Sequence, residues 1–290
     1  MVMDIISLVL LGLGVQSYIS HPSVLGVETV QNTIASQLIN TTESSTTSGV
    51  QLPVQGRTKQ EIQKERERLE EIKLTSESEH IKKRDVYKSF LATVKSTGDY
   101  KKTISKLREY HDAESSAYTS MIKARMNLAA LNSDERQMEY TDIIATFKDS
   151  NKKAKIERIA SQLGTLVQKH KSNMLSTISK METILIENMV QVLERANGKD
   201  TTKYIASAQQ SLQNLLFAKE DVAEVAGKSY VIQLTKEANV KNDIQTTLKT
   251  TIDDLTYTQT MIRNARVVMS NMIQERARLL GETVPVQLTK

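Results

Sequence analysis

The most regular pattern of apolar residues in the chain runs from Asn151 to Ala196 and is closed by Asn197-Gly198. Apolar positions recur there in steps of three and four, which is the spacing of one face of a long helix. The stripe consists of Ile159, Leu163, Leu166, Met174, Ile178, Met181, Leu185, Met189 and Val192, with His170 on the same face as a hydrogen-bonded interior or interface residue. A helix of this length extends about 70 Å, so we expect an elongated body.

A second long pattern predicts a helix from Ser229 to Leu280, which Gly281 ends. Apolar and small residues recur there every seven positions, as in a coiled coil. We interpret this face as a surface that packs against a partner helix, and the pattern leaves open whether that helix belongs to the same chain or to a second copy. The face consists of Ile244, Leu248, Leu255, Ile262, Ala265, Met269, Met272 and Leu279.

Three other segments have helical patterns with their own start and stop signals. Residues 57–95 carry many opposite charges and a thin apolar stripe, which indicates a protruding helix or a coiled-coil seam. Asp99–Leu131 predicts a helix that stops at a turn, Asn132-Ser133-Asp134, before a shorter helix through Phe147. Residues 200–226 predict a helix with an Asp or Thr cap, and its short connection to the preceding helix predicts antiparallel packing.

The composition agrees with this helical pattern. Aromatic residues make up 4% of the chain, and three Pro and ten Gly provide few turn residues. The chain has no cysteine, which excludes disulfides and thiolate metal sites. The predicted fold class is therefore all-α, an elongated bundle of long helices with coiled-coil character over residues 57–281, followed by a tail at 282–290.

The N-terminal part differs from the rest in composition. Residues 5–15 form an apolar run that is shorter than the roughly 20 residues of a membrane span but has the length of a signal-peptide core. Asp4 precedes it where a signal peptide usually has a basic residue. We expect residues 1–39 to be an export or membrane-associated segment, although a helix or strand packed on the main body is the alternative. Ser and Thr dominate residues 40–56, which indicates a flexible linker.

The charge is uneven along the chain. The formal net charge is +5, yet residues 1–56 contain no Lys or Arg. A local basic cluster suits a phosphate or an anionic lipid surface, although such clusters are more often solubilising helix ends. It consists of Lys148, Lys152, Lys153, Lys155 and Arg158.

No motif of catalysis, metal binding or cofactor binding stands out. Four histidines occur, no two of them at a metal-ligand spacing on one helix face. The spacing Glu77-x-x-His80 fits half of a di-metal helical site but occurs once, as expected by chance. We therefore predict a non-enzymatic protein with no catalytic residue, no metal, no cofactor and no small-molecule substrate.

One stretch carries a family resemblance. Residues 166–226, most clearly LERANGKDTTKYIASAQQSLQNLLFAKEDV, resemble uncharacterised secreted helical proteins of candidate-phylum bacteria. The shared feature is a helix ending in a turn, here Gly198-Lys199-Asp200-Thr201, followed by a helix with spaced Ala and Leu. The resemblance implies an exported helical bundle and no known activity.

The sequence thus favours a structural or interaction protein in an exported or membrane-associated assembly, without excluding the cytoplasm. Its partner would be a protein or a second copy, bound through helical faces. One alternative is a membrane-active protein that inserts residues 5–39 in a pore-forming manner. A further alternative is a coiled coil that binds nucleic acid through its basic cluster, for which the interleaved charges provide little support.

Overall fold

The computed structural model describes residues 58–94, 100–196 and 198–283. The chain divides into two compact units, Met1–Gln55 and Gly56–Lys290, and every described residue belongs to the second, which we call the helical unit. The predictions for the N-terminal segment and its linker lie outside the described residues.

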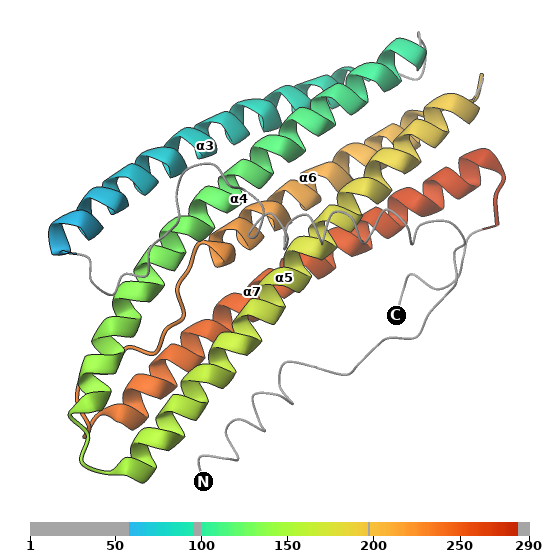
Figure 1. Ribbon diagram of the computed structural model, residues 1–290. Helices are drawn as coiled ribbons and strands as arrows, with labels where there is room; N and C mark the ends of the chain where they lie inside the picture. Colours follow the sequence, from blue (N-terminus) through green and yellow to red (C-terminus); the bar gives the residue numbers. More distant parts are fainter. Residues whose placement is uncertain (1–57, 95–99, 197, 284–290) are drawn as a thin grey trace, which may run out of the picture. The chain divides into compact units, whose positions relative to one another are not determined.

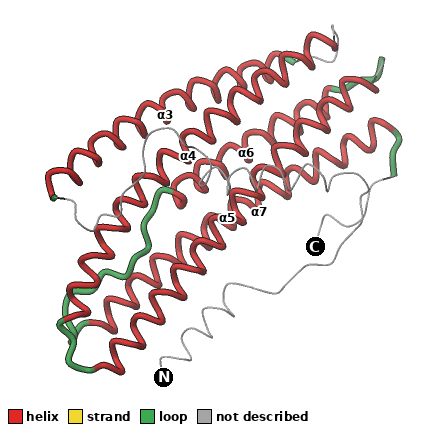
Figure 2. Tube along the Cα trace, viewed as in Figure 1, coloured by secondary structure: helices red, strands yellow, loops and turns green. Residues whose placement is uncertain are grey.

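Long helices account for nearly all of the described residues. They are α3 (Lys59–Thr93), α4 (Tyr100–Ala145), α5 (Ser150–Arg195), α6 (Thr202–Ala226) and α7 (Val240–Leu280), and no strand occurs in the ranges that the structure describes. Figure 2 shows these helices, with a short loop between α4 and α5 and a longer one between α6 and α7. The prediction of an all-α bundle of long helices is confirmed.

The longest predicted stripe forms α5 with the expected ends. The Asp149 carboxylate accepts hydrogen bonds from the backbone N–H groups of Asn151 and Lys152, which satisfies free donors of the first turn. After the helix, Gly198 has a φ of 73°, the left-handed conformation that glycine adopts without strain. Gly281 ends α7 in the same conformation, so both predicted stop signals are confirmed.

The helical unit has two subassemblies (Figure 1). Helices α3 and α4 form an antiparallel pair, which we call the hairpin, and Arg125 of α4 bonds Glu77 of α3 at 2.7 Å. Helices α5, α6 and α7 form what we call the three-helix body, in which α6 and α7 pack along each other. The hairpin meets this body mainly where α4 contacts α5 and α6.

One apolar core joins the two subassemblies. It includes Leu107 and Met121 from the hairpin and Ile178 and Leu215 from the body. Burying a large aliphatic side chain contributes about 1.5–3 kcal/mol. Helix α6 has the most enclosed position, because it contacts α3, α4, α5 and α7.

Helix α4 corrects one prediction. The expected turn at 132–134 is helical, and α4 continues without a break to Ala145. The segment contains neither Gly nor Pro, so nothing in its backbone forces a stop. Buried Leu131 and Tyr140 on either side continue the packed face, and the Ser133 hydroxyl lies 2.8 Å from that of Ser229.

Helix α7 corrects a second prediction, because it begins at Val240 rather than Ser229. The connection from Gly227 to Asn239 has no regular secondary structure over most of its length. It still buries Ile232 and Leu234 against the bundle. The Asp243 carboxylate accepts bonds of 2.8 and 3.0 Å from the Thr235 amide and hydroxyl, which anchors the connection to the first turn of α7.

Leu215 and Phe217 on α6 provide a matched test of this packing. Leu215 is fully buried, whereas Phe217 faces outward two residues later. We predict that Leu215→Ala lowers the free energy of unfolding by about 2–5 kcal/mol, because it leaves a cavity in the core. Phe217→Ala should cost less than half as much in urea denaturation, and equal losses would contradict the assigned register.

Candidate functional site

The predicted partner-helix face of α7 packs inside its own chain. Ile244, Leu255, Ile262, Ala265, Met269 and Met272 are buried, and Leu248 and Leu279 are partly buried. The helices that cover this face are α5 and α6, and the Ser211 hydroxyl of α6 donates to the Val268 carbonyl of α7 at 3.3 Å. The heptad pattern left open whether the neighbour is in the same chain or in a second copy, and in this structure the face packs on helices of its own chain.

The basic cluster does not form one continuous surface. Lys148, Lys155 and Arg158 are exposed. The Lys152 ammonium instead donates to the Glu237 carbonyl at 2.6 Å, which ties the start of α5 to the connection before α7. A structural role thus accounts for Lys152, while the exposed members remain free to meet solvent or an anion.

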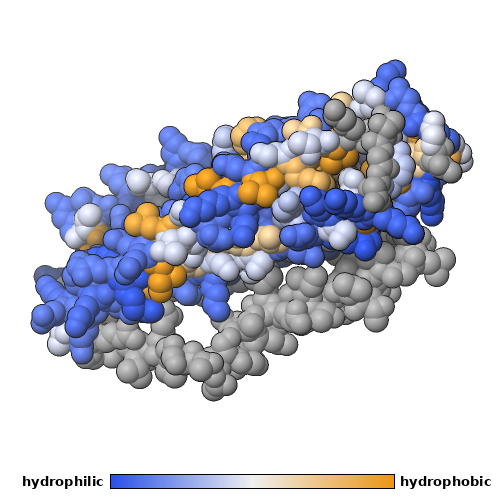
Figure 3. All heavy atoms as spheres, turned by 90° about the horizontal axis from the view of Figure 1, so that it is seen from above, coloured by the Kyte–Doolittle hydropathy of each residue, from blue (hydrophilic) through white to orange (hydrophobic). Residues whose placement is uncertain are grey.

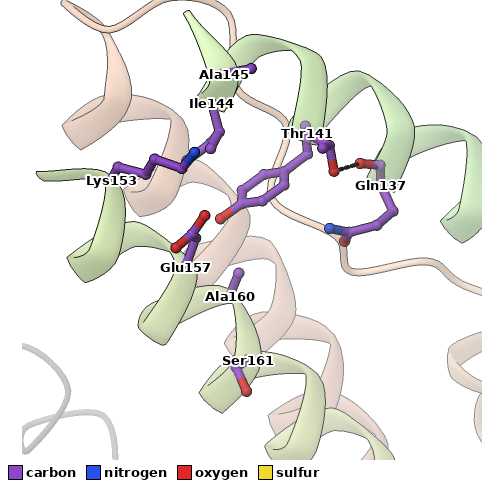
Figure 4. A pocket seen from close by; sticks show the side chains of 9 residues that line it. Gln137, Thr141, Ile144, Ala145, Lys153, Glu157, Ala160 and Ser161 are labelled. Carbon is purple, nitrogen blue, oxygen red and sulfur yellow. Dashed lines mark hydrogen bonds between the residues drawn. The ribbon is translucent and has the colours of Figure 1, made fainter. Parts of the chain in front are cut away.

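Lys153, the remaining member of the basic cluster, lines a cavity of about 380 Å³ between α4 and α5. Figure 4 shows Lys153 and Glu157 of α5 on one side of the cavity, with Lys153 beside Ile144, and Thr141 and Gln137 of α4 on the other side. The complete lining is Gln137, Tyr140, Thr141, Ile144, Ala145, Lys153, Glu157, Ala160 and Ser161. The Thr141 hydroxyl already donates to the Gln137 carbonyl at 2.7 Å.

Tyr140 is the unusual residue of this cavity. It is 5% exposed, and its hydroxyl has no hydrogen-bond partner among the described residues. Burial raises the pKa of Tyr140 to about 12, so the phenol is protonated at neutral pH. The hydroxyl can donate a hydrogen bond, but the lining does not pair a nucleophile with a base.

A buried charged cluster lies at the centre of the bundle, and the sequence reasoning missed it. Lys219 of α6 is 1% exposed, and its ammonium lies 2.8 and 2.7 Å from the two carboxylate oxygens of Glu114 on α4. The same ammonium donates to Glu182 of α5. His80 of α3 bonds Glu114 through Nε2 at 2.9 Å, so four helices contribute to the charged cluster.

Aromatic groups enclose the charged cluster. The Lys219 ammonium lies 4.2 Å from the ring centroid of Tyr118, a cation–π distance. The Tyr118 hydroxyl donates to the Lys219 carbonyl at 3.0 Å, and the His80 ring lies 5.5 Å from that of Tyr118. The buried positive charge is thus compensated by carboxylates and by the face of an aromatic ring.

These contacts shift the pKa of Glu114 and of two neighbouring tyrosines. Burial alone would raise the pKa of Glu114, but the hydrogen bond to His80 and the charge of Lys219 outweigh it and lower that pKa below its ordinary value. Burial, with the nearby carboxylates, holds the pKa of Tyr87 and Tyr118 well above the ordinary value for tyrosine. Glu114 is therefore charged at neutral pH, and both tyrosines are neutral.

The space beside the charged cluster is small. A cavity of about 10 Å³ is lined by Tyr87, His111, Glu182 and Lys219 among others. This is the volume of about one water-sized sphere. The Tyr87 hydroxyl and His111 Nε2 have no partner in the described part of the chain. The cluster is thus built for holding helices together rather than for enclosing a substrate.

The histidines named from the sequence have structural surroundings. His170 Nδ1 lies 3.0 Å from the Gln259 amide nitrogen, as expected for a hydrogen-bonded histidine at a helix interface. Glu77 pairs with Arg125 while His80 turns to Glu114, so the spacing Glu77-x-x-His80 does not bring two ligands together. Among the described residues, no group of three His, Asp or Glu side chains is arranged to hold a metal ion.

A sequence signal for the charged cluster did exist. Lys219 follows Leu212 and Leu215 at helical spacing, and Glu182 lies between Ile178 and Leu185 on the apolar face of α5. A charged residue at such a position must be paired when the face is buried.

The orphan hydroxyl of Tyr140 leads to one prediction. Because a buried hydroxyl without a partner loses hydration and gains nothing, we predict that Tyr140→Phe leaves the free energy of unfolding unchanged within about 0.5 kcal/mol or raises it. Chemical denaturation measures this change, with the hydrogen-bonded Tyr118→Phe as the matched control. A loss for Tyr140→Phe as large as that for Tyr118→Phe would contradict the assignment.

The lowered pKa of Glu114 leads to a second prediction. Its folded-state pKa lies below its unfolded value, so its contribution to stability is present above the ordinary carboxyl pKa and is lost as the pH falls through the folded value. We predict that Glu114→Gln lowers stability at pH 7 and flattens the fall in stability below pH of about 5. Denaturation curves across this pH range test the prediction. It is contradicted if the free energy of unfolding of the variant falls with decreasing pH as steeply as that of the wild type.

Comparison with models of protein families, with curated proteins and with solved structures finds no match to this chain. The resemblance of residues 166–226 to secreted helical proteins therefore remains a prediction from the sequence. The function has to be inferred from the arrangement of the helices themselves.

Proposed function

We propose that this chain is a non-enzymatic structural or interaction protein whose helical unit supports a binding surface for a protein partner. The observation that supports this proposal is a set of exposed apolar side chains, with Ile81 of α3 and Phe217 of α6 near the ion pair that joins the two helices and Leu74 further along α3. We call this set the seam surface and define it by Leu74, Ile81 and Phe217, which are 64%, 46% and 48% exposed.

Two cross-helix contacts fix the geometry of the seam surface. Arg84 of α3 forms an ion pair with Glu220 of α6, and the Gln209 amide donates to the Leu91 carbonyl at 2.8 Å. Rising residue numbers in α3 therefore meet falling numbers in α6, so the helices are antiparallel.

The apolar members of the seam surface lie on the same side as the Arg84–Glu220 pair. Ile81 precedes Arg84 by three residues, and Phe217 precedes Glu220 by three, so each lies one helical turn from the pair on the same face. Leu74 precedes Ile81 by seven residues and continues the line along α3.

The space-filling view shows how apolar side chains are distributed over one face of the molecule. Figure 3 shows hydrophobic side chains gathered in separate patches among hydrophilic ones on the face seen from above Figure 1. Apolar side chains exposed in groups mark interaction sites more often than single ones do.

The compartment is also part of the proposal. An exported or membrane-associated assembly is supported by the apolar run at residues 5–15 and by the resemblance of residues 166–226. Within the described ranges, none of the helices has a stretch apolar enough and long enough to cross a bilayer.

Charge substitution of the seam surface tests the function. We predict that Leu74→Lys, Ile81→Lys and Phe217→Lys together weaken self-association or binding of a co-purifying protein by at least about tenfold, because each places a charge in a buried contact. Sedimentation equilibrium and affinity purification of the full chain measure this loss, and circular dichroism verifies the fold.

The matched control uses the outer face of α7. Tyr257 and Val267 are also exposed, so Tyr257→Lys with Val267→Lys adds charge at the surface without touching the seam. This variant should behave as wild type. A wild-type chain that is monomeric and retains the same proteins as the triple variant would contradict the proposal.

A further inference from the structure

We propose that the α3–α4 hairpin is a separable arm, which the charged cluster holds on the three-helix body, and that protonation of the cluster's carboxylates releases the arm while the helices remain folded. This conformational change goes beyond a fixed support, because it would uncover apolar faces that are buried in the closed form.

The packing divides the helical unit along this line. Within the hairpin, α3 and α4 pack along most of their length, with Arg66 paired to Glu135 and the Phe90 ring 5.0 Å from that of Tyr110. Within the body, α6 and α7 pack equally extensively. The contacts of α4 with α5 and α6, and of α3 with α6, are sparser than those within either of these two pairs, and α5 packs on α6 and α7 only somewhat more densely.

The charged cluster spans this junction. Glu114 and His80 belong to the hairpin, whereas Glu182 and Lys219 belong to the body. The two bonds from Lys219 to Glu114 and the bond from the Tyr118 hydroxyl to the Lys219 carbonyl all cross from one subassembly to the other. These buried polar contacts lock the hairpin in one position on the body.

The other charged groups near the cluster have partners of their own. On the hairpin, Arg125 pairs with Glu77, and His111 pairs with Asp112. The Arg84–Glu220 pair crosses to α6 at the surface. No hydrogen bond or ion pair joins α7 to the charged cluster in the ranges that the structure describes.

Loss of the negative charges beside the Lys219 ammonium is what releases the hairpin in this proposal. At neutral pH the Lys219 ammonium is compensated by the carboxylates of Glu114 and Glu182. When these carboxylates lose their charge in acid, the ammonium stays buried without a counter-ion. An uncompensated buried charge destabilises the closed form strongly. Separation of the hairpin brings water to these groups without unwinding any helix.

The apolar part of the junction explains why the arm stays closed until then. Leu107, Met121 and Ile122 of α4 belong to the same core as Ile178 and Leu185 of α5. Their burial favours closure at every pH, so release requires the loss of cluster pairing in addition. The lowered pKa of Glu114 places that loss below the ordinary carboxyl range.

The absence of native cysteine makes a direct test available. Spin labels at Lys82→Cys on α3 and Gln210→Cys on α6 report the distance between hairpin and body, since both positions are exposed. A second pair, Gln210→Cys with Asn264→Cys on α7, reports distances within the body. Pulsed electron resonance between pH 7 and 3 should show the first distance lengthen and broaden while the second stays unchanged.

Circular dichroism over the same pH series separates release from unfolding. The proposal predicts that the first distance changes before helicity falls. It is overturned if both distances change together with the loss of helicity, which indicates global unfolding. It is also overturned if neither distance changes down to the lowest pH.

A charge-free cluster is the matched variant. Glu114→Gln, Glu182→Gln and Lys219→Met together remove the buried charges, so the arm should stay closed at a pH at least about one unit lower than in wild type. Arg84→Gln with Glu220→Gln removes only the surface pair. The pH at which half of the molecules have released the hairpin should then stay within about half a pH unit of the wild-type value. If both variants shift the pH of release by the same amount, the proposed role of the charged cluster is overturned. If the triple variant does not fold, the two wild-type label pairs decide the matter alone.

Discussion

The burial of the Lys219 ammonium is the constraint on which the arrangement of α3, α4, α5 and α6 depends. A buried charge is tolerated only when it is paired and hydrogen-bonded. The partners come from α4 and α5, and Glu114 in turn fixes His80 of α3. Apolar faces alone allow helices to slide and rotate, but these directed bonds permit one register. The charged cluster thus joins four helices through directed bonds in addition to their apolar packing.

A second buried lysine follows the same principle at the end of α6. The Lys171 ammonium of α5 donates to the Ala226 and Lys228 carbonyls at 3.1 and 2.7 Å, where the helix end presents unpaired acceptors. It also lies 5.3 Å from the Tyr230 ring centroid. Burial lowers the pKa of Lys171 to about 8. The hydrogen bonds to the two carbonyls stabilise the charged ammonium and thereby offset part of the cost of burying it. Residues from α5 therefore fix both the middle and the end of α6.

The sequence predicted those elements whose signals are local. The stripe of α5, the span of α6 and the glycine stops at Gly198 and Gly281 depend on neighbours a few residues apart. The continuity of α4 and the late start of α7 depend on tertiary contacts of Leu131, Tyr140 and Ile232, which no local pattern contains.

The candidate sites show the same division. Heptad spacing identified a real packing face on α7 but could not distinguish a neighbour in the same chain from a second copy. The positions of Glu182 and Lys219 on apolar faces indicated that each needs a buried partner, but their pairing with Glu114 joins residues far apart in sequence. Only the fold brings them together.

A double-mutant cycle between Lys219 and Glu114 measures most directly whether their pairing organises the bundle. Lys219→Met and Glu114→Gln should each lower the free energy of unfolding, because each leaves a buried group without its partner. The double variant should cost less than the two losses added together, by about 1–3 kcal/mol. Strictly additive losses at neutral pH would show that the two side chains do not interact, and would contradict a bundle held by this buried pair.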